Sequence, residues 1–195
     1  MIVIGDEARD KMLNGINLVA DAVKPTLGPM AKTVVLKEHG RPIIVNDGVT
    51  VAKAVSHEDE FVDMGAKLLI EVATQAQSLA GDGTTTACVL AQAFCEKGME
   101  LIKKGNNPVH VSNNLKKITD EISTELLEMA KPISDSNDIV NVATIAANND
   151  KEIGTLIAKA IETVGNSGVV TVSESQDMNT TLEVVNGLEI ERGYR

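Results

Sequence analysis

The stretch of this sequence best suited to chemistry is Gly-Asp-Gly-Thr-Thr-Thr at residues 81–86. It separates two long apolar segments, so we expect a turn that leads into a helix N-terminus. The glycines at 81 and 83 permit backbone angles that let a ligand approach the main chain. Free amides and the positive end of the helix dipole would then face outward, which favours phosphate. Asp82 offers an anionic oxygen of the kind that Mg²⁺ prefers, and the threonines add hydroxyl groups.

The same six residues also have a purely structural explanation. Asp-Gly is a common turn dipeptide, and threonine is an ordinary helix cap. A Walker A loop is excluded, because the G-x-x-x-x-G-K-[ST] spacing is not matched and no lysine follows the threonines. Taken alone, residues 81–86 leave the phosphate site and the simple cap open.

Three segments together resemble the nucleotide-binding motifs of the chaperonins, specifically group I, the GroEL type. They are residues 79–87, 26–29 and 46–52, and they stand in the family's order and approximate spacing. Further matches run to the end of the chain, at residues 144–148, 164–172 and 192–194. The resemblance covers nearly the whole chain but only the first part of that family's much longer subunit.

The resemblance implies binding of ATP with Mg²⁺, and it admits K⁺ as a further ion. The residues implied in nucleotide binding are Thr26, Leu27, Gly28, Pro29, Asn46, Asp82, Gly83, Thr84, Thr85, Thr86 and Ile145. Asp82 is the expected Mg²⁺ ligand. Asp47 is either a helix N-cap or a carboxylate near the γ-phosphate and its metal, and it is the catalytic candidate. The family's main water-activating aspartate belongs to a segment that this sequence does not include.

The chain departs from the family pattern at the edge of the expected site. Most relatives have Lys-Gly where this sequence has Met30 and Ala31, and bacterial relatives have lysine at the place of Asn46. These exchanges remove positive charge from around the expected phosphates.

Composition limits the classes of protein that this chain can belong to. Hydrophobic residues make up 43% of the 195, but aromatic residues only 2%. We therefore expect a core of Ala, Val, Ile and Leu, as in helix-rich proteins. A net charge of −10 argues against nucleic-acid binding. No apolar run of about 18 residues predicts a membrane span, and no basic leader is present, so we expect a cytoplasmic protein.

Neither the cysteines nor the histidines predict a site of their own. Cys88 and Cys95 would lie about 10 Å apart along one helix, beyond the reach of a disulfide. We expect both to be small buried apolar residues. His39, His57 and His110 share no metal-ligand spacing.

The sequence predicts a mainly α (α+β) fold. Apolar periodicity indicates helices over 8–24, 47–55, 61–79, 84–104, 108–131, about 138–147 and 150–164. Residues 33–36 and 42–45 predict a β-hairpin, and 3–4, 169–173, 181–185 and 188–191 predict short strands. The helix over 84–104 is apolar on most faces, so we expect it to be central.

The resemblance divides this fold into parts of three domains. Residues 1–130 would be the N-terminal half of a helical, equatorial-type ATP-binding domain. Residues 131–186 would be the first half of a small α/β intermediate domain, and 187–195 the start of a truncated apical domain. The hairpin would pair with terminal segments of a neighbouring subunit, which implies assembly into rings.

Three functions remain open. By resemblance, the chain is the N-terminal part of an ATP-dependent folding chamber, a homo-oligomeric double ring whose apical domain binds unfolded polypeptide and a co-chaperonin lid. Alternatively, it is a non-catalytic fragment that at most binds nucleotide and acts by assembly with full-length subunits. The third reading is an unrelated helical scaffold that uses residues 81–86 as a cap. We expect the 195-residue chain alone to be impaired in ATP hydrolysis and prone to aggregation.

Overall fold

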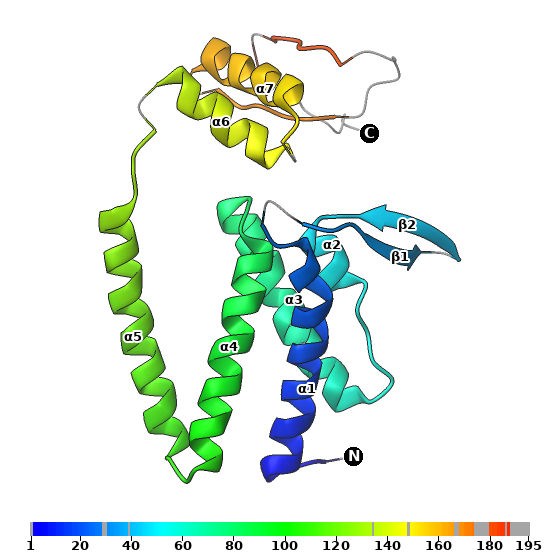
Figure 1. Ribbon diagram of the computed structural model, residues 1–195, viewed down its shortest axis with the longest axis vertical. Helices are drawn as coiled ribbons and strands as arrows, with labels where there is room; N and C mark the ends of the chain where they lie inside the picture. Colours follow the sequence, from blue (N-terminus) through cyan, green and yellow to red (C-terminus); the bar gives the residue numbers. More distant parts are fainter. Residues whose placement is uncertain are drawn as a thin grey trace. The chain divides into compact units, whose positions relative to one another are not determined.

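A computed structural model describes residues 2–28, 31–38, 40–133, 135–147, 149–165, 168–173, 180–185 and 187. The chain divides into two compact units, Met1–Glu128 and Met129–Arg195. The described part is mainly helical, with one antiparallel hairpin (Figure 1). None of the described helices is both long and apolar enough to cross a bilayer.

The first unit is a group of helices with a hairpin inserted after the first one. Its helices agree with the predicted segments to within a few residues at each end. The elements are α1 (Gly5–Val23), the 3₁₀ turn η1 (Lys24–Thr26), β1 (Val34–Glu38), β2 (Arg41–Val45), α2 (Gly48–Lys53), α3 (Glu60–Ala80), α4 (Thr84–Lys103) and α5 (Pro108–Met129).

Helices α1 and α3 cross at two glycines that permit very close approach. A side-chain carbon added at Gly15 would lie 2.6 Å from the amide nitrogen of Ala66, and one at Gly65 would lie 2.7 Å from the carbonyl carbon of Met12. Both distances are shorter than van der Waals contact, so no larger residue fits. The crossing therefore fixes α1 against α3.

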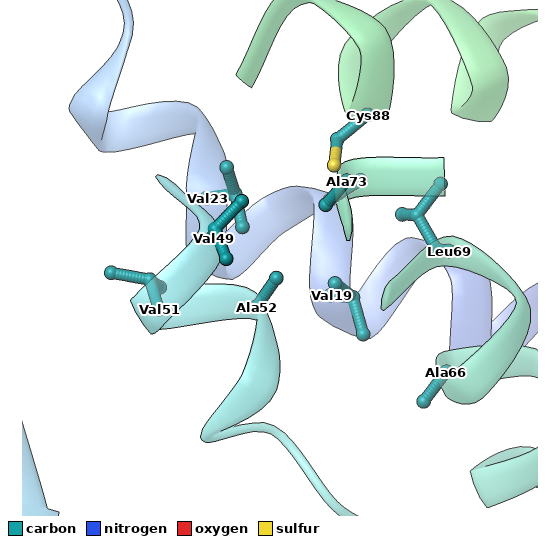
Figure 2. Packing of buried hydrophobic residues seen from close by; sticks show 10 residues of the cluster. Val19, Val23, Val49, Val51, Ala52, Ala66, Leu69, Ala73 and Cys88 are labelled. Atoms are coloured by element: carbon teal, nitrogen blue, oxygen red, sulfur yellow. The ribbon is translucent and has the colours of Figure 1, made fainter. Parts of the chain in front are cut away.

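The core of the first unit lies where α1, α2, α3 and α4 meet. Figure 2 shows small aliphatic side chains from all four helices gathered in one cluster. Its members are Val19, Ala20, Val23, Val49, Val51, Ala52, Ala66, Leu69, Ala73 and Cys88. The expected aliphatic core without aromatic residues is confirmed in the described residues, since no Phe or Tyr belongs to this cluster.

The predicted hairpin is confirmed. β1 and β2 pair antiparallel, with Val34 opposite Val45 and Val35 opposite Ile44. The first pair faces inward and packs against the core, whereas Val35 and Ile44 are 66% and 72% exposed. Alternation along each strand thus gives the hairpin one buried face and one exposed apolar face.

The expectation of a central α4 is only half right. Cys88 and Gln92 on one side are buried, but Leu90 and Leu101 are 52% and 45% exposed. α5 follows α4 through a tight turn and diverges from it (Figure 1). Most apolar residues of α5 are exposed, and Val111 is its buried one. An amphipathic pattern predicts a helix but cannot say which of its faces is covered.

The second unit contains α6 (Ser136–Ala146) and α7 (Lys151–Val164), which pack against each other. A carbon added at Gly154 would lie 2.6 Å from Thr144 Cα, so the two helices touch there. An apolar groove of about 640 Å³ lies beside them, lined by Ile133, Asp135, Ser136, Ile139, Val142, Ala143, Ile157 and Ile161.

Three strand predictions are wrong. Residues 3–4, 169–173 and 181–185 are described and contain no strand. A β-branched run becomes a strand only when a neighbouring edge accepts its hydrogen bonds, and in the described residues these segments have no such partner. The predicted strand over 188–191 lies outside the described residues, as does nearly all of 187–195.

Candidate functional site

Helix α4 begins without a side-chain cap. Its N-cap is Gly83, which has a left-handed backbone with φ 79°, and Gly81 at the end of α3 is also left-handed with φ 74°. Other residues rarely adopt this conformation, so the glycines are needed for the reversal between the helices. Among the described residues, no side chain accepts a hydrogen bond from the first amides of α4. Unpaired amides at a helix start form a site suited to an anion.

Asp82 lies in this reversal and is exposed. Its Oδ1 accepts a hydrogen bond from the amide of Gly83 at 2.6 Å. Within the described part of the chain, no hydrogen bond or ion pair uses its other carboxylate oxygen. Asp82 is therefore held next to the N-terminus of α4, with lone pairs available to a ligand.

A buried pair of threonines holds the start of α4 against η1. Thr26 Oγ1 donates to the carbonyl of Val23 at 2.8 Å and lies 2.9 Å from Thr85 Oγ1. A hydroxyl has one hydrogen, and that of Thr26 is directed at Val23. Thr85 must therefore donate to Thr26. The hydroxyl of Thr85 thus serves an internal bond and has no hydrogen left for a ligand.

The start of α2 completes the arrangement. Asp47 caps this helix, accepting from the amides of Val49 at 3.4 Å and Thr50 at 2.9 Å, and from the Thr50 hydroxyl at 2.7 Å. Burial opposes ionisation of Asp47, but the hydrogen bonds from Thr50 and Val49 outweigh it and hold the pKa of this carboxyl below its usual range. Asp47 is therefore an anion at neutral pH.

Gly48, the first residue of α2, lies directly against the start of α4. A carbon added to it would lie 2.5 Å from Thr85 Oγ1 and 3.1 Å from Thr84 Oγ1. The ends of η1, α2 and α4 therefore meet at one place, although they are far apart in the sequence.

The predicted site residues are only partly brought together. Thr26 is hydrogen-bonded to Thr85, and Thr84 and Thr85 both lie beside Gly48. Leu27 and Gly28 follow Thr26 at the surface, and Asn46 lies at the surface two residues before Gly48. Asp82, Gly83 and Thr86 belong to the same reversal and first turn. Ile145 lies on α6 in the second unit and is 66% exposed. Pro29 lies outside the described residues, as does Met30.

Sequence reasoning missed two residues that support this site. Gly48 was visible as the glycine that follows a capping aspartate, but its contact with Thr85 was not. Gln92 is 5% exposed and donates to Asn17 at 3.0 Å and to Asp21 at 3.3 Å, which ties α4 to α1. A glutamine among the apolar residues of α4 was the available signal.

The carboxylates near the start of α4 suit a metal ion that is coordinated mainly by a bound phosphate compound and water. Among the described residues, no group of three or more His, Cys, Asp or Glu side chains could form a protein cage for a metal ion. Mg²⁺ ordinarily uses one or two carboxylates and completes its shell with phosphate oxygens and water. Asp82 is exposed, and Asp47 is an anion at neutral pH. Both carboxylates lie near the uncapped start of α4 and fit this pattern.

Comparison with known proteins places this chain in a family. Residues 19–195 match the model of the TCP-1/cpn60 chaperonin family. The structure resembles that of the chaperonin gp146 from the bacteriophage EL 2 (Pseudomonas aeruginosa), crystallised in the presence of ATP-BeFx, with 27% sequence identity and a TM-score of 0.68. The match covers 80% of this chain and 28% of the phage chaperonin.

These matches rule out the unrelated helical scaffold. The family model covers the described site from η1 to α4 as well as the second unit. The described part of this chain, mainly helical with one antiparallel hairpin, matches a mainly α, equatorial-type chaperonin region. The chain belongs to the TCP-1/cpn60 chaperonin family.

Proposed function

We propose that the first unit binds Mg-ATP where η1, α2 and α4 meet, and that the chain is the nucleotide-binding part of an ATP-dependent protein-folding chaperonin. In such a protein, ATP binding drives conformational changes of a ring. The observation that carries this proposal is the uncapped start of α4, held in place by the Thr26–Thr85 hydrogen bond.

The phosphates would lie at the start of α4. The unpaired amides of its first turn and the helix dipole attract negative charge. Among the described residues, no hydrogen bond uses the hydroxyl of Thr84 or Thr86, so both could donate to a ligand, whereas Thr85 uses its hydrogen for Thr26. Gly28 has φ 78° and open space around it, so a phosphate could approach its backbone closely.

The carboxylates would serve the metal. Asp82 would bind Mg²⁺ through the oxygen that Gly83 does not use. Bound Mg²⁺ would neutralise charge on the phosphate oxygens and polarise them. Asp47 would face the distal phosphate, because it lies at the start of the helix that touches Thr84 and Thr85. Its cap bonds fix the direction of its remaining lone pairs.

The remaining assignments come from the family and concern a longer protein. The chain spans 28% of the phage chaperonin. We assign residues 1–130 to an equatorial domain, 131–186 to an intermediate domain and 187–195 to the start of an apical domain. Ring assembly, a cytoplasmic location, and binding of polypeptide and a lid belong to this proposal.

A second candidate is supported by the exposed apolar residues of α5. Ile118, Ile122 and Leu126 are 47%, 43% and 59% exposed, and they lie on one face at helical spacing. A chain with such a face could bind nucleotide without hydrolysing it and act only by assembly with full-length subunits. ATP hydrolysis by the 195-residue chain, at a rate that depends on Asp82, would favour the first candidate.

The test is titration calorimetry of the 195-residue chain with ATP, with and without Mg²⁺. Asp82→Asn keeps an oxygen for the Gly83 amide but removes the charge, so it isolates the metal-binding role. We expect a loss of Mg-ATP affinity of about ten-fold or more, equivalent to ~1.4 kcal/mol. Affinity for ATP without Mg²⁺ should change little.

The matched control is Asp59→Asn. Asp59 is also an aspartate at a helix start, and it caps α3 by accepting from Phe61 and Val62. This variant should bind Mg-ATP like the unaltered chain. If the unaltered chain does not bind Mg-ATP, or if both variants bind it equally well, the proposed site is wrong.

A further inference from the structure

Gly48 has no assigned role, yet it occupies the tightest point of the site. It is a buried residue between Thr84, Thr85 and Val23, and an added carbon would meet all three at 3.2 Å or less. Its backbone is helical rather than left-handed, since it opens α2 and is absent from the positive-φ glycines. Backbone geometry therefore does not require glycine here.

Local propensity would even favour alanine. Glycine within a helix is less stable than alanine, because it loses more conformational freedom on folding. If Gly48 were an ordinary helical residue, Gly48→Ala would stabilise the chain. The contact with Thr85 predicts instead that Gly48→Ala destabilises the chain. The two explanations of this glycine therefore predict stability changes of opposite sign.

The atom in the way cannot easily move. An added methyl would lie 2.5 Å from Thr85 Oγ1, and this oxygen is buried and donates to Thr26. Turning the Thr85 side chain would break that bond and leave a buried hydroxyl unpaired. Val23, the neighbour at 3.2 Å, is 0% exposed and packed in the core. The remaining response is a shift of the start of α2 away from α4.

We infer that Gly48 is a positioning residue, whose lack of a side chain sets the spacing between the Asp47 carboxylate and the uncapped amides of α4. This inference rests on the proposed function, because the ligand that spans the two helix starts is Mg-ATP. Widening the gap separates the groups that would hold the distal phosphate from those that would hold the rest of the phosphate chain.

The test begins with Gly48→Ala and its matched control Gly98→Ala. Gly98 is also a buried helical glycine, but an added carbon there meets Leu115 and Val111 at an ordinary 3.6 and 3.8 Å. We expect Gly48→Ala to weaken Mg-ATP binding by about ten-fold. Gly98→Ala should stay within about two-fold of the unaltered chain. A folded Gly48→Ala that binds as tightly as Gly98→Ala would overturn the inference.

A comparison of the double variant Gly48→Ala/Thr85→Ala with Thr85→Ala tests the steric cause and does not depend on the folding of Gly48→Ala. Thr85→Ala removes the oxygen that the new methyl would meet. We expect Gly48→Ala/Thr85→Ala to bind Mg-ATP within about three-fold of Thr85→Ala alone, since the 2.5 Å contact is then gone and the contacts with Thr84 and Val23 that remain are longer, at 3.1 and 3.2 Å. A double variant that binds about ten-fold more weakly than Thr85→Ala would overturn the inference.

Failure of the inference about Gly48 can be distinguished from failure of the proposed Mg-ATP site. If the unaltered chain does not bind Mg-ATP, both proposals fall. If it binds and Asp82→Asn weakens binding while Gly48→Ala does not, the site stands and only the role of Gly48 is wrong. Thermal unfolding without ligand, followed by circular dichroism, separates loss of affinity from loss of fold.

Discussion

Helices α7 and α4 begin in opposite ways. At the start of α7, Asp150 has an extended backbone, and its Oδ1 accepts from the amides of Glu152 and Ile153 at 3.0 Å each. At the start of α4, Gly83 has a left-handed backbone and no side chain, so the first amides stay unpaired. The cap of α7 is thus supplied by its own sequence, whereas no described side chain caps α4.

A helix start without a local cap must be held in place by contacts with other elements. Two hydrogen-bonded groups secure α4: Thr85 with Thr26 near its start, and Gln92 with Asn17 and Asp21 two turns later. A salt bridge from Lys103 to Asp10 fixes its far end at 2.7 Å. Tertiary contacts with α1 and η1 thus replace the local cap.

The largest expected effect lies in the packing of α7. Gly154→Ala would place a carbon 2.6 Å from Thr144 Cα and 2.7 Å from its amide nitrogen, and backbone atoms cannot move aside. We expect a loss of about 3 kcal/mol in the stability of the second unit. Hydrogen exchange with mass spectrometry should show faster exchange in α6 and α7. Unchanged exchange there would contradict the packing.

The next effect concerns the backbone at the start of α4. Gly83→Ala forces a β-carbon into a left-handed conformation with φ 79°, at a cost of about 1–2 kcal/mol. Gly83→Asn should cost less, because asparagine tolerates this conformation better than alanine. Urea unfolding of both variants checks this order. If the two variants are equally stable, the left-handed start of α4 is wrong.

A smaller effect is expected at the closed start of α7. Asp150→Ala removes the acceptor for two amides and should cost about 1 kcal/mol. Exchange should quicken in Glu152 and Ile153, and Mg-ATP affinity should not change. By contrast, Asp82→Ala should affect nucleotide binding more than helix stability. If Asp150→Ala weakened nucleotide binding more than Asp82→Ala, the distinction between the capped start of α7 and the uncapped start of α4 would be wrong.

The smallest effect is the pH dependence of the cap on α2. Hydrogen bonds from Thr50 and Val49 lower the pKa of Asp47 below its value of about 3.9 in an unfolded chain. Its contribution to stability is therefore present above pH ~4 and is lost as the pH falls through the lower, folded value. Asp47→Asn still accepts a hydrogen bond but does not titrate, so its acid unfolding should begin at the same pH or higher with a shallower slope. A steeper slope in this variant would contradict the assignment.

Much of the fold could be predicted from the sequence. Apolar residues at helical spacing located α1, α3, α4, α5 and α7 to within a few residues, because this spacing follows the helix period whether or not the apolar face is covered. The alternation around Gly40 located the hairpin. Strands over 169–173 and 181–185 were wrong, because strand formation depends on a partner edge that local sequence does not contain.

The site was predictable in its parts but not in its assembly. The segments 26–29, 46–52 and 79–87 were visible as glycine-containing turns next to helix starts. Their meeting point was not, because Thr26 and Thr85 are 59 positions apart and only the packing of α1 against α4 joins them. The direction of the Thr85 hydroxyl, the space at Gly48 and the support from Gln92 likewise follow from contacts between elements.

By itself, the sequence determined the local properties of this protein: helices with one apolar face, a glycine reversal that leaves the start of α4 uncapped, and carboxylates placed at turns. These depend on residues within a few positions of each other, so a linear pattern can specify them. Only the tertiary structure decided which turns lie together and which glycine, Gly48, has no room for a side chain. Those outcomes depend on distances between helices, which are set where residues without a side chain, Gly15 and Gly65, allow close crossing.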